Sequence, residues 1–156
     1  MGKGKFTRRS ITVRLLVIVV GVFIQSLGMA SIILANLGSD PITAFVQGLS
    51  KVLGLSFGNS MIIFNLVFLV TVFFLDRRTI GVGTVLLAVS LGAFVDLLCP
   101  LLGTIIGTET SLILHIGLLL FGTIFLAVGL GIYQSAEFGL GSPDAFNQII
   151  AKKMKM

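Results

Sequence analysis

The sequence predicts an all-α, polytopic membrane protein, and three observations carry that prediction. Of its 156 residues, 56% are hydrophobic and 11% are charged, whereas charged residues make up about a quarter of an ordinary soluble domain. Four windows are apolar over the length of about 20 residues that a helix needs to cross a bilayer. A short amphipathic segment follows the first and the fourth of these windows.

The four predicted transmembrane helices cover residues 11–35, 57–75, 80–98 and 112–135. The first follows a basic stretch that contains Lys3, Lys5, Arg8 and Arg9, as in a signal peptide. Its apolar part is longer than that of a signal peptide and has no A-x-A cleavage site, so we expect it to remain as a membrane anchor.

Two half-helices are predicted at residues 41–53 and 143–154. Asp40 or Ser39 precedes Pro41, and Ser142 precedes Pro143, so each segment begins with a capping residue followed by proline at the first helical position. A helix of 13 residues is about 20 Å long and too short to cross. Two interpretations stay open: an interfacial helix in the headgroup plane, or a re-entrant helix that enters the bilayer.

The chain also contains a probable internal repeat with an offset of 101 residues. The offset pairs identical residues at eight positions in the first copy, which are Gly21, Gly28, Ala35, Gly38, Ala44, Phe45, Gln47 and Lys51. Residues 1–100 would form repeat 1, with three transmembrane helices and a half-helix, and residues 101–156 an incomplete repeat 2, with one of each. We expect a longer parent chain, or a homodimer or second chain that completes repeat 2.

The positions of the basic residues predict the orientation of the chain. All Lys and Arg residues except Lys51 lie before or at the start of the first window, join the second to the third, or follow the fourth. Cytoplasmic loops are enriched in Lys and Arg, so both termini are predicted to be cytoplasmic. The second repeat then enters the bilayer from the opposite face, which makes the repeat inverted, an arrangement that recurs in secondary transporters.

Polar residues in or beside the apolar windows are the candidate ligand-binding residues, because such residues are costly in hydrocarbon. Asn65 either forms an interhelical hydrogen bond or contributes to a site. Asp96 is either an acid at the outer headgroup boundary or a group that couples transport to a proton or cation. The remaining candidates lie at the starts of the two half-helices and are Ser39, Asp40, Thr43, Ser142 and Asp144.

Small residues predict how the first and fourth windows pack. Gly21, Gly28 and Ala35 recur every seven residues in the first window, and the fourth repeats this spacing in Gly122, Gly129 and Ala136. Small residues allow close approach of two helix backbones in lipid. We therefore expect the two helices to pack on each other along these residues.

The sequence predicts no enzyme. The chain has one Cys (Cys99) and one His (His115), too few for a Cys/His metal site, and it has none of the short catalytic or nucleotide-binding motifs. Basic residues do not cluster on a polar face, which disfavours nucleic acid as a partner. No cofactor is expected, and the lipid bilayer is the predicted partner.

The motif A-x-L-G-S-D-P-I-T-A-F after the first window and G-L-G-S-P-D-A-F after the fourth resemble bacterial YczE/YitT-type integral membrane proteins. The resemblance rests on Gly38, Ser39, Asp40, Pro41 and Thr43 with Gly141, Ser142, Pro143 and Asp144, and on the segment 56–60. It implies a compact multi-pass protein of the bacterial plasma membrane, and it brings no settled substrate and no catalytic residue.

These observations favour a transporter or translocase-like protein for a small or amphiphilic solute. The alternative is a non-transporting interaction protein that stabilises or regulates a membrane partner. The transporter hypothesis requires that residues 38–43 and 141–145 approach one another near the bilayer centre, where two helix N-termini would meet.

Overall fold

The computed structural model describes residues 8–75, 82–107, 111–135, 146 and 151. Within these residues the chain forms five helices: α1 (Arg8–Ala35), α2 (Pro41–Leu53), α3 (Phe57–Leu75), α4 (Val82–Ile106) and α5 (Leu112–Ser135). Four of them, α1, α3, α4 and α5, are long and apolar enough to cross a membrane. The predicted multi-pass architecture is confirmed at this level.

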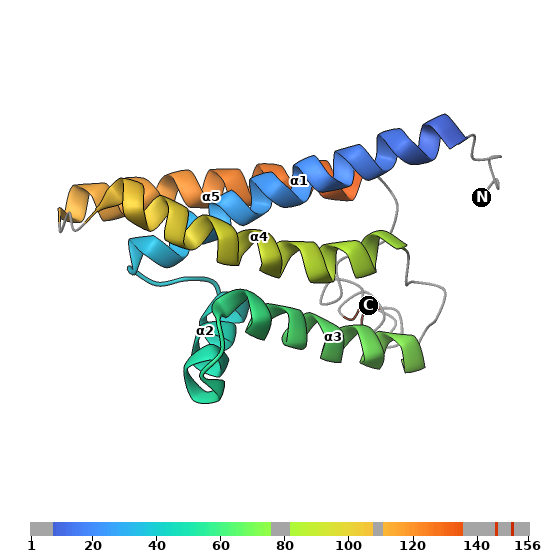
Figure 1. The fold of residues 1–156 in the computed structure, drawn as a ribbon, viewed down its shortest axis with the longest axis horizontal. Coiled ribbons are helices and arrows are strands. Elements are labelled where there is room, and N and C mark those ends of the chain that lie inside the picture. Colours follow the sequence, from blue (N-terminus) through green and yellow to red (C-terminus); the bar gives the residue numbers. More distant parts are fainter. Residues whose placement is uncertain (1–7, 76–81, 108–110, 136–145, 147–150, 152–156) are drawn as a thin grey trace.

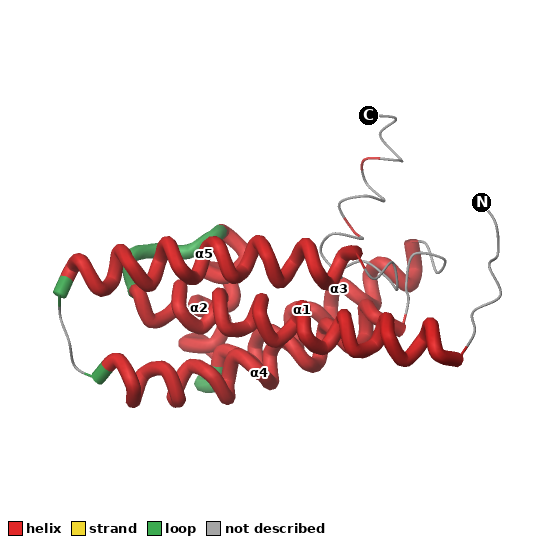
Figure 2. Tube along the Cα trace, turned by 90° about the horizontal axis from the view of Figure 1, so that it is seen from above, coloured by secondary structure: helices red, strands yellow, loops and turns green. Residues whose placement is uncertain are grey.

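The four long helices lie roughly along one direction, and α2 runs across them (Figure 1). Helix α1 packs against both α5 and α4, α4 packs against α3, and α2 packs against α3. Viewed from above, α1 lies between α5 and α4 (Figure 2). The long helices thus follow the spatial order α5, α1, α4, α3.

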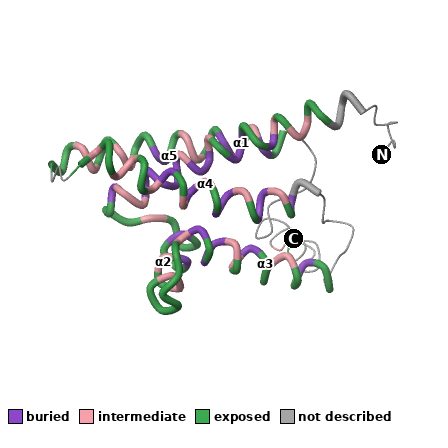
Figure 3. The backbone as a smooth tube through the Cα atoms, viewed as in Figure 1, coloured by how far each residue is buried: buried purple, intermediate pink, exposed green. Residues whose placement is uncertain are grey.

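Burial is concentrated where α1 and α4 face their neighbours (Figure 3). The core consists mainly of aliphatic side chains and includes Ile18, Val22, Leu91 and Val95. Large apolar side chains such as Leu66, Ile113 and Leu120 are exposed instead. An apolar exterior over four long helices is what a lipid environment requires, because lipid leaves no penalty for exposed hydrocarbon.

Glycines bring α1 and α5 into backbone contact, as predicted from their spacing. A methyl group on Gly21 would lie 2.7 Å from the Tyr133 backbone nitrogen, and one on Gly122 would lie 2.7 Å from the Gly28 carbonyl oxygen. Gly129 similarly faces the carbonyl oxygen of Gly21. Ala35 is also buried, while Ala136 lies outside the described residues.

A second pair of glycines joins α3 to α4. A methyl group on Gly92 would lie 3.1 Å from the carbonyl carbon of Gly58. Thr84, Ala88 and Gly92, which share one face of α4, are all buried. Small residues thus hold both interhelical contacts, α1 with α5 and α3 with α4, at close range.

The predicted third span, residues 80–98, was wrong at its C-terminal end. Helix α4 continues through Pro100 to Ile106. Proline removes one backbone donor, and inside a membrane bundle neighbouring groups compensate for that loss. Asp96 therefore lies near the middle of the apolar span Thr84–Ile106 and not at its end.

Helix α2 has the boundaries predicted for the first half-helix, residues 41–53. Pro41 occupies the first turn, and Gly54 ends the helix at φ 64°, a conformation in which a Cβ is unfavourable. The second predicted half-helix, residues 143–154, lies outside the described residues except for Phe146 and Ala151.

Candidate functional site

A cavity of about 210 Å³ lies among the five helices. We call it the central polar cavity. Its volume is several times the roughly 30 Å³ that one water molecule occupies in the liquid. Each of the five helices contributes to the lining, which consists of Gln25, Met29, Asp40, Ile42, Thr43, Met61, Asn65, Leu87, Leu91, Leu126 and Leu130.

Three residues of this lining each carry a buried polar atom that has no hydrogen-bond partner among the described residues. These atoms are Gln25 Oε1, Thr43 Oγ1 and Asn65 Nδ2, and their residues are only 8%, 1% and 3% exposed. A buried polar atom without a partner costs about 1–3 kcal/mol. Three such atoms around one cavity indicate a space that accommodates water or a polar ligand.

The start of α2 supplies the polar end of the cavity. Asp40 caps the helix, because its Oδ2 accepts a hydrogen bond of 3.1 Å from the backbone nitrogen of Thr43. This bond fixes the first turn, and the Thr43 side chain is buried there. The capping sequence thus determines which side chains enter the cavity.

The cavity lies about halfway along the bundle. Gln25, Asn65 and Leu126 lie near the middle of the spans of α1, α3 and α5, which are Thr12–Ala35, Phe57–Phe74 and Leu112–Ser135. Leu87 and Leu91 lie nearer the start of the α4 span Thr84–Ile106. Asp40, Ile42 and Thr43 line the same cavity. The start of α2 therefore reaches the level at which α1, α3 and α5 have their midpoints.

Most exposed residues of α2 are apolar, with Lys51 as the exposed charged residue of the helix. Thr43 and Val46 are buried, while Phe45 and Val52 are 60% and 84% exposed. A helix in the headgroup plane would turn its polar side to water. Apolar side chains facing outward suit a helix that lies beside hydrocarbon.

Of the predicted ligand-binding residues, three lie together: Asp40, Thr43 and Asn65. Ser39 precedes the cap and is not part of the lining. Ser142 and Asp144 lie outside the described residues. Gln25, which lines the cavity, was not among the predicted site residues, although a glutamine in the middle of an apolar window was a sufficient signal.

The hydrogen bond that one hypothesis assigned to Asn65 is not formed by its amide nitrogen, which has no partner. Ser26, one residue after Gln25, is different, because its hydroxyl donates to the Val22 carbonyl at 2.7 Å. It also lies 3.4 Å from the Leu91 carbonyl of α4. Of these polar residues, Ser26 fits an interhelical structural role and Asn65 fits a site.

Asp96 lies apart from the central polar cavity and joins α4 to the start of α3. Its Oδ2 accepts from the Ser56 hydroxyl at 2.5 Å, and its Oδ1 accepts from the Gly58 backbone nitrogen at 2.6 Å. The free amides at a helix N-terminus favour a negative partner. The carboxylate of one helix therefore caps the next, a structural role that was not predicted from the sequence.

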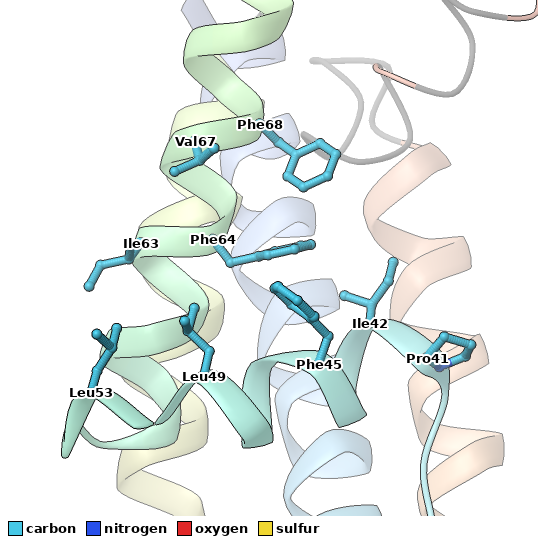
Figure 4. A pocket seen from close by; sticks show the side chains of 9 residues that line it. All are labelled: Pro41, Ile42, Phe45, Leu49, Leu53, Ile63, Phe64, Val67 and Phe68. Carbon is cyan, nitrogen blue, oxygen red and sulfur yellow. The ribbon is translucent and has the colours of Figure 1, made fainter. Parts of the chain in front are cut away.

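A second hollow, of about 610 Å³, lies between α2 and α3. We call it the apolar groove. Aromatic and aliphatic side chains from both helices point into it (Figure 4). It is lined by Pro41, Ile42, Phe45, Leu49, Leu53, Ile63, Phe64, Val67 and Phe68. The Phe68 ring also contacts the ring of Phe146, with centroids 5.3 Å apart.

Comparison with known protein families matches residues 12–156 to a family of unknown function, DUF6198. The chain belongs to this family. Neither the curated proteins nor the solved structures contain a match. The family assigns no chemistry, so the functional argument rests on the cavity.

Proposed function

We propose that the chain is a membrane transporter for a small solute, and that the central polar cavity is its solute-binding site. One observation carries this proposal: three residues that line one cavity carry buried polar atoms, Gln25 Oε1, Thr43 Oγ1 and Asn65 Nδ2, which have no partner in the described part of the chain. A role in scaffolding alone gives no reason to keep three such groups unpaired.

The position of the cavity supports transport. Secondary transporters bind solutes near the bilayer midplane, where short or interrupted helices end among the long ones. Here the start of α2, with Asp40 and Thr43, meets the middle of α1 and α5 at one cavity. This depth and the mostly apolar exposed residues of α2 support the re-entrant interpretation.

The contacts of α1 and α5 support an inverted repeat that comprises residues 1–100 and 101–156. The 101-residue offset makes Gly21 equivalent to Gly122 and Gly28 equivalent to Gly129. Exchange of equivalent residues converts the contact of Gly21 with Gly129 into that of Gly122 with Gly28, and both contacts are present. This is the behaviour of a pair of helices related by a two-fold axis.

The lining of the cavity supports the same two-fold relation. Gln25 and its equivalent Leu126 both line it, as do Met29 and its equivalent Leu130. Because the second copy has leucine where the first has glutamine, the polar groups come from one side. By the same offset, Asp144 corresponds to Thr43, and both Ser142 and Asp144 lie outside the described residues.

The membrane proposed for this protein is the bacterial plasma membrane, with both termini cytoplasmic. The placement rests on the distribution of Lys and Arg and on the resemblance of the G-S-D-P and G-S-P-D motifs to YczE/YitT-type proteins.

The test begins with the purified full chain in nanodiscs, screened by thermal shift against small amines, amino acids, sugars and organic acids. Uptake of each stabilising solute is then measured in proteoliposomes. We expect Asn65→Leu to abolish both responses. The matched control is Asn59→Leu on the same helix, because the Asn59 side chain is exposed and does not line the cavity.

The apolar groove favours a second candidate function, in which the chain binds and stabilises a membrane partner. The nine lining residues are all apolar, and Phe45, Val67 and Leu53 are about half exposed or more. Exposed apolar grooves on helix pairs can accept a further helix. Co-purification of one partner that is lost in Phe45→Ser, together with no solute response in the screen, would favour this function over transport.

A further inference from the structure

Resting on the proposed transport function, we infer that the central polar cavity selects small organic cations, of which an alkylammonium ion is the simplest. The inference uses the charge of the lining, the number of hydrogen-bond acceptors and the apolar remainder of the cavity. It ranks organic cations above anions and neutral polar solutes as ligands of the cavity.

In the described part of the chain, the lining carries one carboxylate, that of the exposed Asp40, and no basic group. Arg14, Lys51 and His115 lie at other positions on α1, α2 and α5 and are not part of this lining. An anion bound there would lose contacts with water and would gain no positive side chain among the described residues, which is unfavourable.

The dipole of α2 does not reverse this sign. A helix N-terminus carries roughly half a positive charge, and a 13-residue helix such as α2 presents that charge near Asp40. The carboxylate accepts from the Thr43 backbone nitrogen and carries a full negative charge. The partial positive charge of the helix terminus and the full negative charge of the carboxylate therefore add to a net negative charge on the side of the cavity where α2 begins.

The polar atoms match an ammonium group in number. Asp40, Gln25 Oε1 and Thr43 Oγ1 are acceptors, and an ammonium ion has three donors to place against them. Asn65 Nδ2 is left as a donor, which suits a water molecule or a hydroxyl group of the ligand. Each unpaired atom of the cavity would then have a partner.

The rest of the lining suits the hydrocarbon part of such a ligand. Met29, Met61, Leu87, Leu91, Leu126 and Leu130 face the cavity. Thioether and isobutyl groups adapt to alkyl chains and provide no polar contact. A short alkyl chain with one ammonium end therefore matches both halves of the lining.

Three probes of similar size and different charge test the inference: n-butylamine, n-butyrate and n-butanol. Each is radiolabelled, and its binding to the full chain in nanodiscs is measured by equilibrium dialysis at neutral pH, with empty nanodiscs subtracted. We expect butylammonium to bind at least about tenfold more tightly than butyrate, because its ammonium group can donate a charge-assisted hydrogen bond to the Asp40 carboxylate.

Asp40→Asn removes the negative charge and leaves the helix cap in place. Asparagine is as good a helix cap as aspartate, so α2 should keep its first turn while the cavity loses its negative charge. We expect the preference for butylammonium over butanol to disappear in this variant. Asn59→Leu, remote from the cavity, should keep the preference of the natural chain.

The outcomes separate the two proposals. Equal or tighter binding of butyrate, or an unchanged cation preference in Asp40→Asn, would overturn the inference on ligand class. If all three probes bind equally and Asn65→Leu abolishes their binding, the cavity remains a solute site without selection for cations. If no probe depends on Asn65, the solute site itself is wrong, and the transport proposal falls with it.

Discussion

Asn65 shows at the scale of one residue how a functional group differs from a structural one. Its side chain is 3% exposed, and its amide nitrogen has no partner. Ser26 is equally buried, but its hydroxyl donates to the Val22 carbonyl. The second arrangement stabilises a helix bundle, whereas the first costs free energy unless water or a ligand occupies the cavity.

We therefore predict that Asn65→Leu makes the protein more stable and less active. Leucine has a similar shape and removes the buried donor, so the free energy of unfolding should rise by about 1–3 kcal/mol. Solute-dependent stabilisation should be lost at the same time. Thermal unfolding in detergent, with and without a solute identified by the screen, measures both effects.

Ser26→Ala provides the control for this prediction. It removes a hydroxyl that already has a partner, so a small loss of stability or no change is expected, with the solute response retained. A loss of stability in Asn65→Leu larger than that in Ser26→Ala would show that Asn65 contributes to packing and would contradict the assignment.

The candidate site was predictable residue by residue only in part. Asp40, Thr43 and Asn65 were predicted because polar residues beside or inside apolar windows stand out. Gln25 was not predicted, and its equivalent in the second repeat is the apolar Leu126, so the repeat does not point to this position. That three helices place these residues at one cavity depends on tertiary packing, which hydropathy does not report.

At the scale of the helix, Asp96 illustrates how one helix can cap another. Its carboxylate accepts from Ser56 and Gly58 at the start of α3, while α4 continues beyond it to Ile106. The sequence suggested an end of the span near Leu98 because Pro100 usually stops a helix in water. In a membrane bundle it does not, and this difference moved Asp96 from an end to the middle.

We predict that Asp96→Ala destabilises the contact of α3 with α4. Loss of two hydrogen bonds to a carboxylate should lower the free energy of unfolding by about 1–2 kcal/mol, since the group is partly exposed. Ser56→Ala and the double variant complete a double-mutant cycle in thermal unfolding. Strict additivity of the two changes would mean that Ser56 and Asp96 do not act together.

The contact of α1 with α5 gives a second prediction at this scale. A methyl group on Gly129 would lie 2.7 Å from the Gly21 carbonyl oxygen and 2.7 Å from the Gln25 Cα. Gly129→Ala should therefore force the two backbones apart and lower the free energy of unfolding by about 1–3 kcal/mol. Thermal unfolding in detergent measures this loss.

Gly131→Ala is the matched control on the same helix, because nothing lies within 4 Å of a methyl group at Gly131. Alanine should be neutral there, or stabilising by up to about 1 kcal/mol. Gly107 is unsuitable as a control. Its φ of 67° is a left-handed conformation, so alanine would be strained there for a reason unrelated to helix packing. Equal effects of Gly129→Ala and Gly131→Ala would contradict the packing argument.

At the scale of the whole molecule, hydropathy was sufficient to predict four membrane-length helices and the short helix α2, since each signal is local. The spacing of Gly21 and Gly28 with Gly122 and Gly129 also predicted which two helices touch. The cavity was not predictable, because it depends on how far α2 enters the bundle. That depth is set by contacts of residues distant in the sequence.

Orientation in the membrane is the final prediction and follows from charge. Arg77 and Arg78 lie between the second and third windows, whereas the segment between the third and fourth carries Glu109 and no basic residue. Arg and Lys are retained on the cytoplasmic side, so Thr79 should face the cytoplasm and Thr108 the outside. Both termini then lie with Thr79.

Single cysteines test this orientation in a Cys99→Ser background, so that only the introduced thiol reacts. An impermeant maleimide should label Thr108→Cys in intact cells, and Thr79→Cys only after the inner face is opened. The Cys99→Ser chain itself should stay unlabelled. The reverse pattern would invert every helix, place Arg77 and Arg78 outside, and make α2 enter from the cytoplasmic face, so that the cavity would be reached by solutes from the opposite compartment.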